Sequence, residues 1–168
     1  MFTFTKKTDY ALLALSYLAT EGESRLVGPR EIAGRYEIPS ELLAKVMQTL
    51  AKRGLVTSVP GPTGGYRLDR TAKLISVGEV VEAMDGPLAI AQCWEEAGVN
   101  GCAQARHCHL RSPLARIQEE VAGLLRAMTL EDLCTSAAQA EPPLPIAPRG
   151  SYPLTMAAVG LGSRETVA

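Results

Sequence analysis

The chain has 168 residues, of which 46% are hydrophobic and 21% are charged, enough for one compact domain with appendages. It has no stretch close to the roughly 20 apolar residues of a membrane span, and its N-terminal lysines precede a helical pattern without a signal-peptide cleavage motif. We therefore expect a soluble, cytoplasmic protein with no membrane association.

Charge is unevenly distributed along the chain. The formal net charge of -1 alone argues against a nucleic-acid binder, since such domains are often strongly basic. Residues 1–73, however, hold 11 Lys and Arg against 7 Asp and Glu, a net of +4, whereas the remaining residues hold 6 against 11, a net of -5. The basic first part is therefore the candidate for DNA binding.

Three helices are predicted in the first 53 residues. The segment TDYALLALSYLA, residues 8–19, has Thr8 as a capping residue, Asp9 as an acid in the first turn, and no helix breaker. In PREIAGRYEI, Pro29 suits the first turn of a second, short helix. An Ile-Pro pair then forces an extended connection, and Ser40 can cap a third helix that runs to about residue 53.

The third helix and the residues after it follow the order of a winged helix-turn-helix. Leu43, Val46 and Leu50 repeat at helical spacing, opposite a polar face. Gly54 ends the helix, and LVTSV, PGPTGG and YRLD then form a strand, a turn and a strand. In a winged helix-turn-helix, such a helix enters the major groove of DNA while the hairpin lies along the DNA backbone. The candidate DNA contacts are Ser40, Lys45, Gln48 and Lys52 on the helix and Gly64, Gly65, Tyr66 and Arg67 on the hairpin.

A small helical domain with an ordinary hairpin is the alternative to the winged helix, because short helices and glycine turns are common. The positions of Pro39 and Gly54 favour the winged helix. The polar face alone does not decide between the two, since a face of mixed charge is usually only solvated.

Two further helices are predicted after the hairpin. ISVGEVVEAMDGPL forms a short helix that Gly86 and Pro87 end. A longer helix begins at Ser112, and its apolar residues alternate spacings of three and four: Leu114, Ile117, Val121, Leu124 and Met128. This narrow stripe either packs on its own domain or, as we favour, forms the seam of a homodimer that reads two half-sites. Thr129 and Asp132 resemble a capping box that begins one last short turn.

The fold class is therefore mainly α with a small β-hairpin wing. We expect a winged helix-turn-helix DNA-binding domain over residues 1–88 and a cysteine-rich loop over residues 89–111. A dimerisation helix then covers residues 112–135, and a flexible tail rich in Pro and Ala covers residues 136–168.

The loop CWEEAGVNGCAQARHCHL holds Cys93, Cys102 and Cys108 in a C-x8-C-x5-C spacing. Thiolates select iron-sulfur clusters, zinc or copper(I), and clustered cysteines in a reducing cytosol favour metal binding over disulfides. Three thiolates leave a fourth position for a histidine, a carboxylate, a small molecule or open iron. A zinc site with His107 or His109 and a thiol redox switch are the alternatives. Cys134 lies apart and is interpreted as structural.

Taken together, these motifs resemble the Rrf-two family of bacterial regulators. The resemblance runs from about Thr5 to Leu133 and rests on KKTDYALLAL, REIAGRYEIP, LAKRGLVTSVPGPTGGYRL, VVEAMDGPL, the three cysteines and TLEDL. It implies a dimeric winged-helix transcription factor, a repressor rather than an enzyme, that binds an operator in double-stranded DNA. The sequence has no nucleotide loop or nucleophile-base pair to support an enzyme or electron carrier.

The resemblance also implies a [2Fe-2S] or [4Fe-4S] cluster held by Cys93, Cys102 and Cys108. IscR-like members use a histidine three residues after the last cysteine, where this chain has Arg111. NsrR-like members use an aspartate of the partner subunit, and Asp9 occupies the matching place. Within the family, the chain looks most similar to regulators of the SUF iron-sulfur assembly operon, on the segments KKTDYA, LAIAQC and RxxLxRI. Sensing of cluster supply is therefore expected, with nitric oxide sensing as the alternative.

Overall fold

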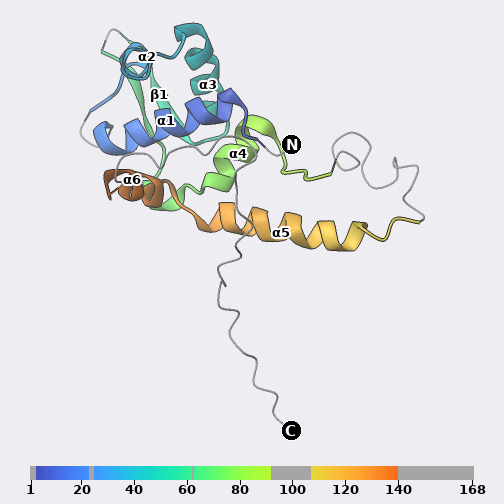
Figure 1. The fold of residues 1–168 in the computed structure, drawn as a ribbon. Helices are drawn as coiled ribbons and strands as arrows, with labels where there is room; N and C mark the ends of the chain where they lie inside the picture. Colours follow the sequence, from blue (N-terminus) through green and yellow to red (C-terminus); the bar gives the residue numbers. More distant parts are fainter. Residues whose placement is uncertain (1–2, 23–24, 62, 92–106, 140–168) are drawn as a thin grey trace.

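The computed structural model describes residues 3–22, 25–61, 63–91 and 107–139 (Figure 1). In chain order the elements are α1 (Lys6–Glu21), α2 (Pro29–Arg35), α3 (Ser40–Lys52), β1 (Val56–Val59), β2 (Gly65–Leu68), the short 3-10 helix η1 (Ala72–Leu74), α4 (Val77–Asp85), α5 (Arg111–Ala127) and α6 (Leu130–Gln139). The predicted mainly helical fold with a small hairpin is confirmed. Within the described residues, no helix is long and apolar enough to cross a membrane.

The core is built around one face of α1. Ala11, Ala14, Leu15 and Leu18 are buried on this face, which packs against α3, α4 and α6. From α3 the core receives Leu43, Val46, Met47 and Leu50, and from α6 it receives Leu130. The helical spacing of these apolar residues explains why α1 and α3 each bury one face and leave the other in solvent.

The start of α1 differs from the sequence prediction. The helix begins at Lys6 with Thr5 as its N-cap, so Thr8 is a helical residue and not the cap. Thr8 is fully buried, and its hydroxyl donates to Asp85 Oδ2 at 2.8 Å. Asp85 also accepts a hydrogen bond from the Thr5 amide at 3.1 Å and one from the Thr5 hydroxyl at 2.5 Å. A carboxylate at the end of α4 thus completes the cap of α1.

The start of α3 also differs from the prediction. Pro39 is the N-cap, and Ser40 is the first helical residue and makes no capping hydrogen bond with its side chain. The Pro39 carbonyl accepts hydrogen bonds from the Leu42 and Leu43 amides, both at 3.0 Å, and this fixes the first turn without the serine hydroxyl. The hydroxyl of Ser40 is therefore exposed and available for another partner.

The hairpin is an antiparallel pair in which Thr57 lies opposite Arg67 and Val59 opposite Gly65. Val27 pairs with Tyr66 through two backbone hydrogen bonds of 3.0 and 2.9 Å, which tie the hairpin to the segment before α2. A Cβ atom on Gly65 would lie 2.6 Å from the Val27 carbonyl oxygen, and one on Gly64 would collide with the Val59 carbonyl oxygen. Both glycines are needed because other backbone atoms approach them closely.

The region assigned to dimerisation, residues 112–135, contains the predicted long helix, α5, and most of α6, which follows it. α5 ends at Ala127 because the backbone of the next two residues pairs with the start of α4. The Val77 amide donates to the Met128 carbonyl at 2.8 Å, and Thr129 forms a bridge with Ser76. The predicted capping box is confirmed, with the Thr129 amide 2.9 Å from Asp132 Oδ2 and the Asp132 amide 3.2 Å from Thr129 Oγ1.

α6 is longer than the short turn expected from sequence. It extends to Gln139 and packs against α1, beside the first helix in Figure 1. The helix therefore continues past residue 136, where the tail was predicted to begin. Residues 140–168 of that predicted tail lie outside the described residues.

Two glycine substitutions test how backbone conformation sets stability here. Gly54 ends α3 with φ +69°, so Gly54→Ala should lower the free energy of unfolding by about 1 kcal/mol. Gly34 lies inside α2 with open space around its Cβ position, so Gly34→Ala should raise it by about 0.5 kcal/mol. Urea unfolding monitored by circular dichroism measures both. Equal effects of the two substitutions would contradict this account.

Candidate nucleic-acid interface

The exposed face of α3 carries the side chains predicted to contact DNA. Ser40, Lys45, Gln48 and Lys52 are all exposed, on the opposite side from the four buried residues that fix the helix to the core. Within the described part of the chain, the ammonium groups of Lys45 and Lys52 make no ion pair. Both charges are therefore available to phosphate groups without first breaking an internal contact.

The wing provides one charged side chain and a rigid support for it. Arg67 is exposed on β2, whereas Tyr66 is half-buried and packs against the core. The Thr57 hydroxyl donates to Asp69 Oδ1 at 2.6 Å and braces the hairpin across its two strands. Of the predicted wing residues, Arg67 is thus the exposed cation, while Gly64, Gly65 and Tyr66 form the backbone and packing around it.

Three further cations near α3 were not among the predicted contacts. Arg30 and Arg35 are exposed on α2, which packs against α3, and Arg53 is exposed at the end of α3. The predicted contacts came only from the third helix and the hairpin, so the arginines of α2 were not among them. The excess of basic residues in this part of the chain could have pointed to these three arginines. They extend the positively charged surface beyond α3.

A polar cluster holds α2 against α1. Arg25 Nη1 donates to Glu31 Oε2 at 2.9 Å, and the Tyr17 hydroxyl donates to Glu31 Oε1 at 2.8 Å. The hydrogen bond from Arg25, followed by that from Tyr17, lowers the pKa of Glu31 from 4.5 to about 2. Tyr17 also meets Tyr36 edge to face, with ring centroids 6.0 Å apart. This cluster fixes the orientation of α2, and so of α3, on α1.

The described residues include one of the three loop cysteines. Cys108 is exposed, three residues before α5 begins, and His107 and His109 beside it are exposed as well. Cys93 and Cys102 lie outside the described residues. Asp9 is exposed in the first turn of α1, and its carboxylate makes no hydrogen bond or ion pair with another described residue. Within the described residues, no three His, Cys, Asp or Glu side chains are grouped to hold a metal.

The two described candidate ligands, Cys108 and Asp9, fit a metal group in their chemistry. Both side chains are exposed and unpaired among the described residues, so ligation would not require an internal contact to be broken. A thiolate suits iron or zinc, and a carboxylate can occupy a fourth position. Cys134 differs from them because it is half-buried against the core, with its sulfur 4.0 Å from the Ser16 carbonyl oxygen. This packing supports a structural role for Cys134.

The described beginning of the cysteine loop is attached to two helices. Asp85, the last residue of α4, is bonded to Thr5 and Thr8 of α1. Five residues later, the Ile90 amide donates to the Gln118 side chain of α5 at 3.2 Å. The chain that leads to Cys93 is thus joined both to the winged-helix core and to the long helix.

Comparison with known proteins identifies the family. The sequence profile of Rrf2, described as an iron-dependent transcriptional regulator, matches residues 4–136. The chain belongs to the Rrf2 family. It is 36% identical over 135 residues to the protein aau3 of Rhizobium meliloti (strain 1021), covering 80% of this chain and 86% of that one. It is 33% identical over 129 residues to the HTH-type transcriptional regulator NsrR of Bacillus licheniformis, covering 77% and 90%.

Solved structures of family members share the fold. IscR of T. potens matches with a TM-score of 0.65 at 25% identity, covering 84% of this chain and 93% of that one. CymR of B. subtilis, named a global cysteine regulator, matches with a TM-score of 0.63 at 25% identity, covering 80% and 98%. This Rrf2 protein is therefore a winged-helix transcriptional regulator of the NsrR, IscR and CymR type. It binds DNA and is not an enzyme.

The Glu31 cluster predicts a pH dependence of stability. Because the pKa of Glu31 is lowered on folding, its contribution is fully present above about pH 4.5 and is lost as the pH falls through about 2. The urea midpoint of the wild type should therefore fall more steeply over this window than that of Glu31→Gln. The difference is small and shrinks in high salt because the pair is exposed. Parallel pH profiles for the two proteins would show that the cluster does not stabilise the fold.

Proposed function

We propose that this regulator is a homodimeric repressor whose affinity for its operator depends on an iron-sulfur cluster bound to the cysteine loop. The observation that carries the proposal is the attachment of the loop's beginning to α1 through Asp85 and to α5 through Gln118. A change in the loop therefore has short, hydrogen-bonded routes to the DNA-binding domain and to the candidate dimer helix. Family membership supports the DNA-binding part of the proposal.

In the proposed complex, the two α3 helices of a dimer enter successive major grooves. Ser40, Lys45, Gln48 and Lys52 face the DNA, and Arg67 contacts the backbone from the wing with Gly64, Gly65 and Tyr66 supporting it. Half-sites are then about 34 to 36 Å apart, one helical turn of DNA, or a multiple of this distance. The orientation of the two α3 helices depends on α5, which projects from the body of the domain in Figure 1.

The proposed ligands are Cys93, Cys102, Cys108 and the partner's Asp9. When bound, a [2Fe-2S] or [4Fe-4S] cluster supplies a redox-sensitive and reagent-accessible iron centre. The protein's own part is to present the three thiolates on a loop whose start is fixed, and to keep an exposed carboxylate on the first turn of α1. We propose genes of iron-sulfur cluster assembly as the targets, so that the protein reports cluster supply.

Nitric oxide sensing is the second candidate, favoured by the relatives that carry the name NsrR. The two candidates differ in the signal that releases the operator. An anaerobically prepared protein that releases its operator after stoichiometric nitric oxide, and not after mild removal of iron, would favour the NsrR-like function. The opposite response would favour the sensing of cluster supply.

Lys45→Ala is expected to weaken operator binding across a salt series. One lysine per subunit contacts phosphate in the proposed complex, so the slope of log affinity against log salt should fall by about 2 per dimer. The operator is obtained by selection from a random duplex pool, and affinity is measured by fluorescence anisotropy. Lys73→Ala is the matched control, since this lysine pairs with Glu131 at 3.5 Å on another part of the domain. An unchanged slope for Lys45→Ala would remove it from the interface.

Cys108→Ala is expected to change operator affinity by roughly 5- to 150-fold, the usual size of coupling between two sites. It should also remove the difference in affinity between protein prepared without oxygen and protein treated with an iron chelator. Cys134→Ser is the matched control, because its sulfur packs against the core and lies apart from the loop. If Cys108→Ala and Cys134→Ser both bind and respond like the wild type, the loop does not control DNA binding.

A further inference from the structure

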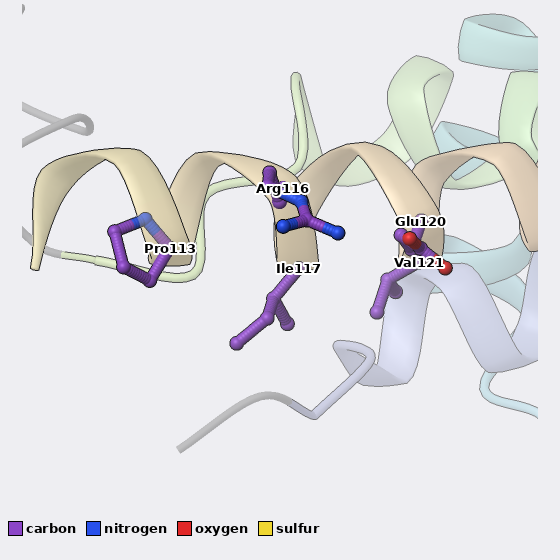
Figure 2. Close-up of a pocket in the computed structure, with 5 residues that line it drawn as sticks. All are labelled: Pro113, Arg116, Ile117, Glu120 and Val121. Carbon is purple, nitrogen blue, oxygen red and sulfur yellow. The ribbon is translucent and has the colours of Figure 1, made fainter.

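Glu41, on the exposed face of α3, has no role in the proposed complex, although its neighbours on that face do. Other exposed features already have one. A hollow of about 360 Å³, for example, lies on the proposed dimer helix α5, and Figure 2 shows its lining: Pro113, Arg116, Ile117, Glu120 and Val121. Glu41 instead lies on the surface proposed to meet DNA, where a negative charge needs an explanation.

Glu41 is in line with three of the side chains proposed to face the DNA. From residue 41 to the end of α3, the exposed residues are Glu41, Lys45, Gln48 and Lys52. A helix turns by about 100° per residue, so these four lie within about 60° of one another and form one stripe. In a helix-turn-helix, the N-terminal residues of the recognition helix contact the base edges. Glu41 is the N-terminal end of the stripe, so the proposed docking brings it to the bases.

The carboxylate of Glu41 has no partner within the described part of the protein. In the first turns of α2, α4 and α6, by contrast, Glu31, Glu79 and Glu131 each pair with a cation. Glu41 makes no ion pair or side-chain hydrogen bond with another described residue, including Lys45 one turn further on. Its interaction with the dipole of α3 is common to all acids in a first turn. The carboxylate is therefore open to a group from outside the protein.

A carboxylate at this place can bind few groups of a DNA duplex. It only accepts hydrogen bonds, and it is repelled by the phosphates that attract Lys45 and Lys52. In the major groove, guanine and thymine present acceptors, whereas cytosine presents the N4 amino group and adenine the N6 amino group. The adenine amino group lies between two acceptors, its own N7 and the O4 of the paired thymine, and these repel the second carboxylate oxygen. Cytosine is therefore the best match for a glutamate.

We infer that Glu41 reads a cytosine in each half-site by accepting a hydrogen bond from its N4 amino group, and that it rejects a base that presents an acceptor there. This inference rests on the proposed docking of α3 in the major groove and adds a specificity determinant to it. Lys45 and Lys52 bind any duplex through its phosphates, whereas Glu41 weakens binding to every duplex that lacks the matching amino group. Selectivity thus comes from a repulsive group placed beside attractive ones.

The test compares the full-length wild type with Glu41→Ala and Glu41→Gln, all prepared without oxygen. Each protein selects an operator from a random duplex pool, and affinities are measured by fluorescence anisotropy. The wild type should select a cytosine at one position of each half-site, and replacing it by thymine in both half-sites should weaken binding roughly 25-fold or more. Glu41→Ala should select no base at this position, and the same replacement should change its affinity by less than about threefold.

Two more results are expected from the same chemistry. Glutamine can bond to N6 and N7 of adenine together, so Glu41→Gln should select adenine in place of cytosine. Glu41→Ala should bind a duplex of random sequence roughly two- to fivefold more tightly than the wild type at low salt, because a charge that repels phosphates has been removed.

Glu131→Ala is the matched control. Glu131 is the second residue of α6, as Glu41 is the second residue of α3, so both substitutions remove a first-turn carboxylate and its interaction with a helix dipole. Glu131 pairs with Lys73, and its helix packs on α1 and η1. Its loss should leave the selected bases unchanged.

The outcomes separate this inference from the docking on which it rests. If the wild type and Glu41→Ala prefer the same base at every position, or if Glu41→Ala loses affinity equally for all duplexes, Glu41 reads no base and the inference is wrong. A reduced salt slope for Lys45→Ala would then still leave α3 as the DNA-binding helix. If neither Glu41→Ala nor Lys45→Ala alters binding, α3 is not the recognition helix, and the proposed complex fails together with the inference.

Discussion

The carboxylate of Asp85 joins segments that are 77 to 80 residues apart and determines how the rest of the molecule is connected. It ends α4, accepts three hydrogen bonds from the first turn of α1, and stands immediately before the cysteine loop. Burial opposes its ionisation, but the hydrogen bonds from Thr5 and Thr8 and the charge of Lys7 outweigh this and lower its pKa. Asp85 therefore stays ionised near neutral pH, and the loop begins at a fixed point on α1.

From this point α4 connects the loop to the DNA-binding surface. At its other end, Glu79 completes the capping box with Ser76 and pairs with Arg70, just after the wing, at 2.6 Å. In its first turn Gly78 faces α5 so closely that a Cβ atom would lie 3.1 Å from the Arg126 amide nitrogen. A nine-residue helix thus contacts α1, α3 and α5 together. Because packed helices shift as units, a change at the loop would reach all three.

The local patterns in the sequence predicted most of the fold, and long-range contacts account for the errors. The spacing of Leu43, Val46 and Leu50 located α3, and Gly54 located its end. The cap of α1 was assigned to Thr8 because no local pattern reveals that Asp85 reaches Thr5 from α4. Likewise, α6 was expected to be a short turn because its packing on α1 is invisible in its own sequence. The candidate DNA contacts followed from polar periodicity, whereas Asp9 as a ligand came only from resemblance, since a partner's residue leaves no local signal.

The most direct test of the central claim is the content of the cysteine loop in protein purified without oxygen. The visible absorption spectrum is recorded on the same sample as iron, acid-labile sulfide and zinc analyses. The account predicts broad visible absorption with iron and sulfide in equal amounts. A colourless protein with stoichiometric zinc would contradict it, because a closed zinc site stabilises the loop but supplies no redox-sensitive centre.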